Sequence, residues 1–251
     1  MATLATPSNI SSDPSIGLPG RRYDHFFFSG MALLILATVF AGFARTYFLA
    51  GIFRAPLPSL IIHLHAAAFT AWILLLVTQT SLVSAGSLDV HRRLGIAGFV
   101  LGCLMVIVGI MAATDSLIRR GGPAGRDPQS FYIVPLTDMV FFATLLFFAF
   151  RNRQDSAAHK RLIYVATNAL LIAAIARIPI DFSYRKIFIA TLLSDIFLLA
   201  LVTYDLWSTH KIHRATLWAG GFLVFIQQVR LPIGKTATWH AFAGWVQRLQ
   251  W

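Results

Sequence analysis

The chain has few of the residues that build disulfide scaffolds and thiolate metal sites. It contains one cysteine, Cys103, so it forms no intrachain disulfide and no cysteine cage for zinc or an iron–sulfur cluster. All ten acidic residues are aspartate, which excludes motifs that require glutamate, such as the HExxH zinc motif. Only 12% of the residues are charged, about half of the share that is usual in soluble domains. The composition therefore argues against an ordinary soluble enzyme.

Apolar sequence takes up most of the chain instead, and 57% of the residues are hydrophobic. A membrane-spanning helix needs about 20 predominantly apolar residues. Only helices and closed barrels satisfy their backbone groups in lipid, and these runs lack the alternation of a barrel. We therefore expect an all-α integral membrane bundle of seven transmembrane helices. The seven stretches are 25–50, 58–84, 91–116, 130–150, 159–180, 187–207 and 213–231.

Two segments flank this transmembrane domain, which we place at residues 23–234. Residues 1–22 are rich in Ser, Pro and Gly, and this composition predicts a disordered N-terminal tail. In residues 235–251, apolar side chains recur every three or four positions at Trp239, Phe242, Val246 and Leu249. That spacing predicts an amphipathic helix lying in the membrane interface.

The formal charge of +11 is spread thinly. The 21 Lys and Arg residues stand in small groups between the apolar stretches, where they suit anionic lipid headgroups and not a nucleic acid duplex. With residues inside helix ends left out, ten lie on the N-terminal side and eight on the other. This bias predicts a cytoplasmic N-terminus and a place in the cell's inner (plasma) membrane.

Ionisable residues inside the apolar stretches are the main indication of function, because each costs at least ~2.5–3.5 kcal/mol at bilayer depth. Three enter the spans by about 10 Å from the face away from the N-terminus, and four more lie at span ends on that same face. A common polar cavity accounts for this one-sided distribution. The predicted ligand-binding residues are Arg45, His65, Asp115, Asp138, Arg177, Asp195 and Arg230.

Helical geometry selects among neighbouring candidates. Asn168 and Arg177 are nine residues apart and so lie on opposite faces of a helix. We favour Arg177, with Asp181 as a partner one turn on. Gln227 and Arg230 are three residues apart and share a face.

Imidazole and carboxylate ligands suit zinc, iron or copper(II), and we predict a transition-metal site at His65, Asp138 and Asp195. Haem stays an alternative without support, because His65 has no second histidine at its depth. Retinal is excluded because a Schiff base needs a lysine inside the last span. The four lysines lie in connectors or the tail, at Lys160, Lys186, Lys211 and Lys235.

A second pattern lies on the N-terminal face, where odd-numbered spans begin with histidine and basic residues at His25, His91, His159 and His213. Such residues anchor helix ends at anionic lipid. The alternative is a ring of histidines around a metal or the edge of a haem.

Two helix starts, His-Arg-Arg-Leu-Gly at 91–95 and Ala-His-Lys-Arg-Leu at 158–162, resemble those of uncharacterised bacterial multi-pass membrane proteins. The ending with Tyr204-Asp205, His213 and Trp239-His240 is similar to theirs as well. The resemblance covers most of the chain after residue 20, and no activity comes with it. A looser similarity, carried by spaced histidines, is to small helical proteins linked to respiratory-oxidase assembly.

Three functions follow from these residues. The first is a membrane protein that binds a metal ion or a small polar ligand in a redox- or respiration-linked role. The second is a carrier in which arginines attract an anionic substrate while aspartates relay protons. The third is an accessory subunit of a larger complex or a homo-oligomer, in which polar residues only tie helices together.

Overall fold

The structure is a computed structural model that describes residues 23–249 except 57, 120–125 and 180–185. Within these residues every element is helical. The predicted tail 1–22 lies outside them. The elements are α1 (Asp24–Phe43), the π-helical turn η2 (Ala44–Phe48), α2 (Ala50–Phe53), α3 (Leu60–Ser84), α4 (Leu88–Ile118), α5 (Pro128–Arg151), α6 (Ser156–Ile175), α7 (Lys186–Thr209), α8 (Arg214–Gly234) and α9 (Ala237–Arg248).

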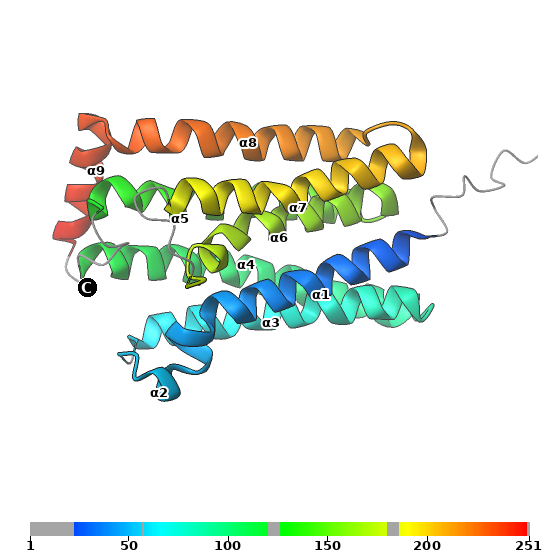
Figure 1. Cartoon of the computed structure of the whole chain (residues 1–251), viewed down its shortest axis with the longest axis horizontal. Helices are drawn as coiled ribbons and strands as arrows, with labels where there is room; N and C mark the ends of the chain where they lie inside the picture. The colour runs from blue at the N-terminus through cyan, green and yellow to red at the C-terminus, as the bar shows by residue number, and fades with distance from the viewer. Residues whose placement is uncertain (1–22, 57, 120–125, 180–185, 250–251) are drawn as a thin grey trace, which may run out of the picture.

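The long helices α1 and α3 to α8 lie side by side along the long axis of the molecule, and α9 stands across one end of them (Figure 1). We call the end where α1 begins the near end and the end where α9 lies the far end. Consecutive long helices run in opposite directions along this axis (Figure 1). Residues distant in sequence therefore meet at the same level of the bundle.

A long helix occupies each predicted apolar stretch, and the first stretch departs most from its prediction. Residues 25–50 were expected to form one continuous helix. In the structure α1 ends at Phe43, and the π-helical turn η2 and the short α2 follow it. Arg54 ends α2 in a left-handed conformation, with φ 53°. This region turns across the far end of the bundle (Figure 1).

Five helices of the described chain are long and apolar enough to cross a membrane: α1 continued by η2, α3, α4, α5 and α7. Helices α6 and α8 fall outside that set. Helix α6 is the central helix of the bundle, in contact with α1, α5, α7 and α8. Most of its side chains are buried against other helices. Its polar residues therefore face protein, and its composition reflects that environment.

Several helices begin at side chains that accept a hydrogen bond from a backbone N–H of the first turn. These capping residues are Asp127 before α5, Asp155 before α6, His213 before α8 and Thr236 before α9. Each satisfies a donor that has no partner within its helix. Gly86 has φ +72° in the tight turn between α3 and α4, a backbone conformation that glycine adopts at little cost.

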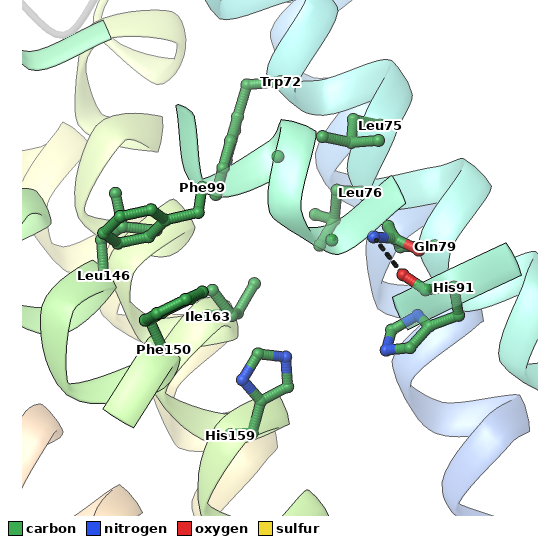
Figure 2. A pocket seen from close by; sticks show the side chains of 12 residues that line it. Trp72, Leu75, Leu76, Gln79, His91, Phe99, Leu146, Phe150, His159 and Ile163 are labelled. Carbon is green, nitrogen blue, oxygen red and sulfur yellow. Dashed lines mark hydrogen bonds between the residues drawn. The ribbon is translucent and has the colours of Figure 1, made fainter. Parts of the chain in front are cut away.

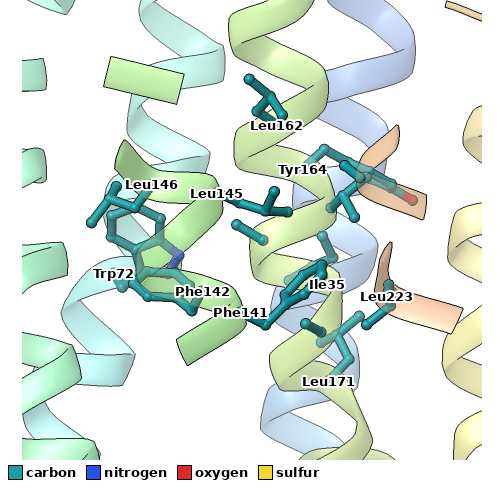
Figure 3. Packing of buried hydrophobic residues seen from close by; sticks show 14 of the residues in the cluster. Ile35, Trp72, Phe141, Phe142, Leu145, Leu146, Leu162, Tyr164, Leu171 and Leu223 are labelled. Atoms are coloured by element: carbon teal, nitrogen blue, oxygen red, sulfur yellow. The ribbon is translucent and has the colours of Figure 1, made fainter. Parts of the chain in front are cut away.

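The main apolar core runs between the long helices, and a smaller cluster lies where α9 packs on α4 and α5. Phe141 and Phe142 of α5 are almost completely buried, as are Ile35 of α1 and Leu171 of α6 (Figure 3). Trp72 of α3 packs edge-on against Phe142, with ring centroids 5.1 Å apart. The outward surfaces of α3, α4 and α7 carry many exposed Leu, Ile, Val and Phe side chains. Exposed apolar area of this extent suits contact with lipid.

Helices α1 and α6 approach each other closely at Gly42. A methyl group on Gly42 would overlap the backbone carbonyl group of Ala174. Small residues at such crossings let two helix backbones come together. This close approach fixes the position of α1 on the central helix.

Candidate functional site

The far half of the bundle contains a buried ion pair. The Arg230 guanidinium on α8 donates a hydrogen bond of 2.6 Å from Nη1 to Oδ1 of Asp138 on α5. The two side chains are 3% and 13% exposed, so the pair is held away from solvent. Both residues were predicted as site residues, and the structure brings them together.

Asp195 of α7 adds a second carboxylate to this region. Gln227 and Arg230 of α8 both lie within interaction range of it. Oδ1 of Asp195 and Oε1 of Gln227 are buried, and neither has a hydrogen-bond partner in the described structure. Gln227 and Arg230 share a buried face of α8, as their spacing predicted.

Asn168 is the polar residue that the sequence argument set aside in favour of Arg177. Its side chain on α6 is fully buried, and its Oδ1 and Nδ2 atoms lack a hydrogen-bond partner among the described residues. An amide within an apolar helix was the available indication, since polar groups at bilayer depth usually mark ligand or ion sites. Which face of α6 would be buried was not evident, because α6 is enclosed by four helices.

These residues all lie in the halves of their helices that are nearer the far end of the bundle. Each is within about 15 Å of the far end of its helix. We call this set the polar layer: Asp138, Asn168, Asp195, Gln227 and Arg230. Buried polar atoms are costly without hydrogen bonds, and nearly all of them in folded proteins have one. The polar layer therefore contains a buried ion pair and also polar atoms whose hydrogen-bonding capacity is unused.

His65 lies in a different setting, on α3 beside Phe69, with ring centroids 4.0 Å apart. Its Nδ1 atom is buried without a hydrogen-bond partner in the described chain. Arg177, at the end of α6, lies within electrostatic range of His65 and over the ring of Phe43, 4.8 Å from its centroid. The predicted partner of Arg177, Asp181, lies outside the described residues.

The other two predicted residues lie at the far-end surface. The Arg45 guanidinium of η2 sits 5.2 Å from the centroid of the Phe53 ring. Oδ2 of Asp115 on α4 accepts a 2.9 Å hydrogen bond from Ser59, and Oδ1 accepts one of 2.8 Å from Arg119. Both act locally, and the structure does not bring them to the polar layer.

The predicted metal ligands are not gathered. In the part of the chain that the structure describes, no three His, Cys, Asp or Glu side chains come together in a group able to hold a metal ion. His65 belongs to the α1–α3–α6 region, whereas Asp138 and Asp195 belong to the region around α8. The depth of a residue in the membrane does not determine how its helix is rotated about its own axis. That rotation decides which side chains face one another.

The near half holds a second buried ion pair that sequence analysis missed. Arg161 of α6 donates to Oδ1 of Asp205 on α7 from Nε at 2.9 Å and from Nη2 at 2.5 Å. Oδ2 of Asp205 accepts from the backbone N–H of His213 at 3.0 Å and from the Thr216 hydroxyl at 2.6 Å. Each carboxylate oxygen of Asp205 thus accepts two hydrogen bonds, and these bonds join α6, α7 and α8.

Next to it, Asp24 of α1 accepts hydrogen bonds from Lys160 of α6 and, at 2.6 Å, from the Tyr204 hydroxyl of α7. The Tyr204 ring stacks on Phe27, with centroids 4.0 Å apart. Lys160 was predicted to lie in a connector, but it belongs to the first turns of α6. In the structure Asp24, Lys160 and Tyr204 connect three helices at the near end.

The four near-face histidines do not form one ring. His25 packs on Phe26, with centroids 4.1 Å apart, and His213 caps α8. His91 and His159 instead line a common pocket (Figure 2). Of the four histidines of this alternative metal or haem site, His91 and His159 share a pocket, and His25 and His213 lie elsewhere.

His213 and Asp127, the capping residues of α8 and α5, have shifted pKa values. Burial lowers the pKa of His213, and the nearby Arg161 guanidinium lowers it further, although Asp205 acts in the opposite direction. For Asp127, burial acts to raise the pKa. Hydrogen bonds from the backbone N–H and hydroxyl of Ser130 outweigh this effect and lower the pKa of Asp127.

No protein-family model, curated protein or solved structure matches this chain.

Proposed function

We propose that the chain is a multi-pass protein of the plasma membrane that binds a small, hydrogen-bond-donating ligand in the polar layer, and that the ligand is in the simplest case a proton. The supporting observation is the set of buried polar atoms on Asn168, Asp195 and Gln227 that have no hydrogen-bond partner in the described structure. Asp195 and Gln227 lie within interaction range of each other, and Asp195 lies within range of Arg230 of the Asp138–Arg230 ion pair.

The charges of the layer favour a proton or a protonated ligand. Asp138 and Asp195 provide two carboxylates, and Arg230 provides one guanidinium. Arg230 is hydrogen-bonded to Asp138, so Asp195 has the Gln227 amide and the more distant charge of Arg230 near it but no ion pair of its own within the described structure. A charge at bilayer depth is costly unless it is paired or neutralised. A proton on Asp195 neutralises the carboxylate and provides a hydrogen-bond donor.

We therefore propose a carrier that relays protons rather than a protein with a metal-linked role. Intramembrane aspartates in carriers commonly serve as proton sites. In the carrier predicted from the sequence, the arginines attract an anionic substrate. Within the layer Arg230 already has a carboxylate partner, and it is better suited to hold Asp138 in place than to bind a free anion.

Carboxyl groups can be followed directly by infrared spectroscopy of the protein in lipid, because a protonated carboxyl has its own C=O stretch. We expect a band that titrates with pH, is lost in Asp195→Asn and is retained in the control Asp89→Asn. Asp89 is exposed in its ion pair with Arg92. A band unchanged in Asp195→Asn would leave the residues of the layer as ties between helices, which is the role of an accessory subunit.

The proposal also takes all seven long helices to cross the membrane, with the N-terminus in the cytoplasm. Helices α6 and α8 are the two that composition alone does not support. Reporter fusions after Asn152 and after Ile178 bracket α6, and fusions after Lys211 and after Lys235 bracket α8. We expect opposite compartments within each pair. The same compartment within either pair would contradict seven spans.

A further inference from the structure

A pocket of about 90 Å³ lies in the near half of the bundle, between α3, α4, α5 and α6 and apart from the polar layer. Aromatic rings and three polar side chains face it (Figure 2). In Figure 2 the imidazoles of His91 and His159 lie on either side of one opening, with the Gln79 amide next to His91. The residues that matter for its chemistry are Trp72, Gln79, His91, Phe99, Phe150 and His159.

The polar side chains of this pocket have hydrogen-bonding capacity to spare. Nδ1 of His159 contacts the carbonyl oxygen of Ala149 at 2.9 Å. A carbonyl only accepts, so Nδ1 carries the proton and Nε2 of the neutral ring is an acceptor. Gln79 donates from Nε2 to the backbone carbonyl of His91 at 3.2 Å. Its Oε1 and Nδ1 of His91 are buried with no hydrogen-bond partner among the described residues.

The apolar part of the pocket suits a flat ring. Phe99 and Phe150 stack on each other, with centroids 4.2 Å apart and planes 27° apart. Trp72 adds a third aromatic side chain. Aromatic rings favour offset-stacked and edge-to-face contacts with another ring.

Volume limits the size of the ligand. About 90 Å³ is several times the ~10–15 Å³ that one water molecule requires by this kind of measure. A single six-membered ring therefore fits, and the four pyrrole rings of a haem do not. The two histidines thus do not form a bis-histidine haem site in this structure.

We propose that this pocket binds the ring of a phenol or quinol that enters from the lipid bilayer. His159 Nε2 and Gln79 Oε1 are both acceptors, so a ring hydroxyl, which donates, matches them better than a ring carbonyl. The aromatic side chains pack against the ring, and the long apolar helices place the pocket within reach of lipid-borne molecules. The proposal does not depend on the polar layer.

The test uses the full chain in lipid nanodiscs, titrated with 4-hexylphenol and, in parallel, with 4-hexylanisole. The second compound has the same ring and tail but a methyl ether in place of the hydroxyl. Binding is measured by calorimetry, and binding to empty nanodiscs is subtracted. We expect one saturable site for the phenol and about 10-fold weaker binding of the ether, because the ether cannot donate a hydrogen bond.

Two variants locate the site. Gln79→Leu and His159→Phe each replace an acceptor with an apolar side chain of similar size. Each should therefore weaken phenol binding by about 10-fold. The control is His240→Phe, since His240 lies on α9 at the far end and contacts Ser130. Phenol binding that does not exceed that of empty nanodiscs, that is matched by the ether, or that is unchanged in both pocket variants would overturn the proposal. If one variant does not fold, the other decides.

Discussion

Removing one partner of the Arg161–Asp205 pair should be among the most destabilising single substitutions in the protein. Asp205 is fully buried and Arg161 is 4% exposed. In Asp205→Ala the guanidinium would keep one hydrogen bond of 2.9 Å to the carbonyl of Ala157 and would lose its carboxylate. Removing one partner of a buried pair typically costs about 3–5 kcal/mol, because the other charge stays buried without compensation.

The backbone N–H of His213 and the hydroxyl of Thr216 would lose their acceptor in the same variant. For a chain of this size, about 3–5 kcal/mol corresponds to a fall of about 6–20 °C in Tm. The measurement is thermal unfolding of the detergent-purified protein followed by tryptophan fluorescence.

The matched control is Asp89→Ala. Asp89 also pairs with an arginine, Arg92, but at 3.6 Å and with side chains 89% and 74% exposed. Exposed pairs contribute about 0–1 kcal/mol, so this variant should unfold close to the parent. The double variant Arg161→Met with Asp205→Leu should be more stable than the sum of the single losses predicts, because no charge is then left buried. Equal Tm values for Asp205→Ala and Asp89→Ala would refute the reasoning.

Three further predictions concern other parts of the bundle. Gly42→Ala should destabilise by about 1–3 kcal/mol because its methyl would overlap the Ala174 carbonyl, whereas Gly30→Ala, with nothing within 4 Å, should gain about 0.5–1 kcal/mol; equal Tm changes would contradict the close approach. Trp72→Phe loses the 3.1 Å bond from Nε1 to Thr167 and should cost about 1–3 kcal/mol, against no more than about 0.5 kcal/mol for the exposed Trp207→Phe in the same unfolding assay. Because the folded-state pKa of His213 lies below its ordinary value, the unfolded chain binds more protons as pH falls through about 6.5, and stability should decrease with acid until pH drops below the folded-state value. Tm measured at pH 7.5 and 5.5 should differ less in His213→Asn, which retains a capping side chain; an unchanged difference would assign the acid sensitivity to other groups.

The sequence alone determined where the helices lie along the chain. Each predicted apolar stretch contains a long helix, because a backbone in lipid must satisfy its N–H and C=O groups within the segment itself. That requirement is local and can be read from length and hydropathy. The spacing of Gln227 and Arg230 also predicted correctly that they share a face, since helical periodicity is local too.

Depth along the helix could be predicted for Asp138 and Asp195, because residues along a helix rise by a fixed distance. Their partners were not readable. Rotation of each helix about its axis depends on packing with its neighbours, and that rotation joined Asp138 to Arg230 while it left His65 beside Phe69.

Only the tertiary structure decided which charged residues at the near end are buried. Arg161 and Asp205 are 44 residues apart, and in sequence both lie close to the ends of predicted spans. They become a buried pair because α6 lies at the centre of the bundle, enclosed by α1, α5, α7 and α8. The pocket between His91 and His159 has the same origin, since packing of α4 against α3 and α5 brings together residues that no sequence spacing relates.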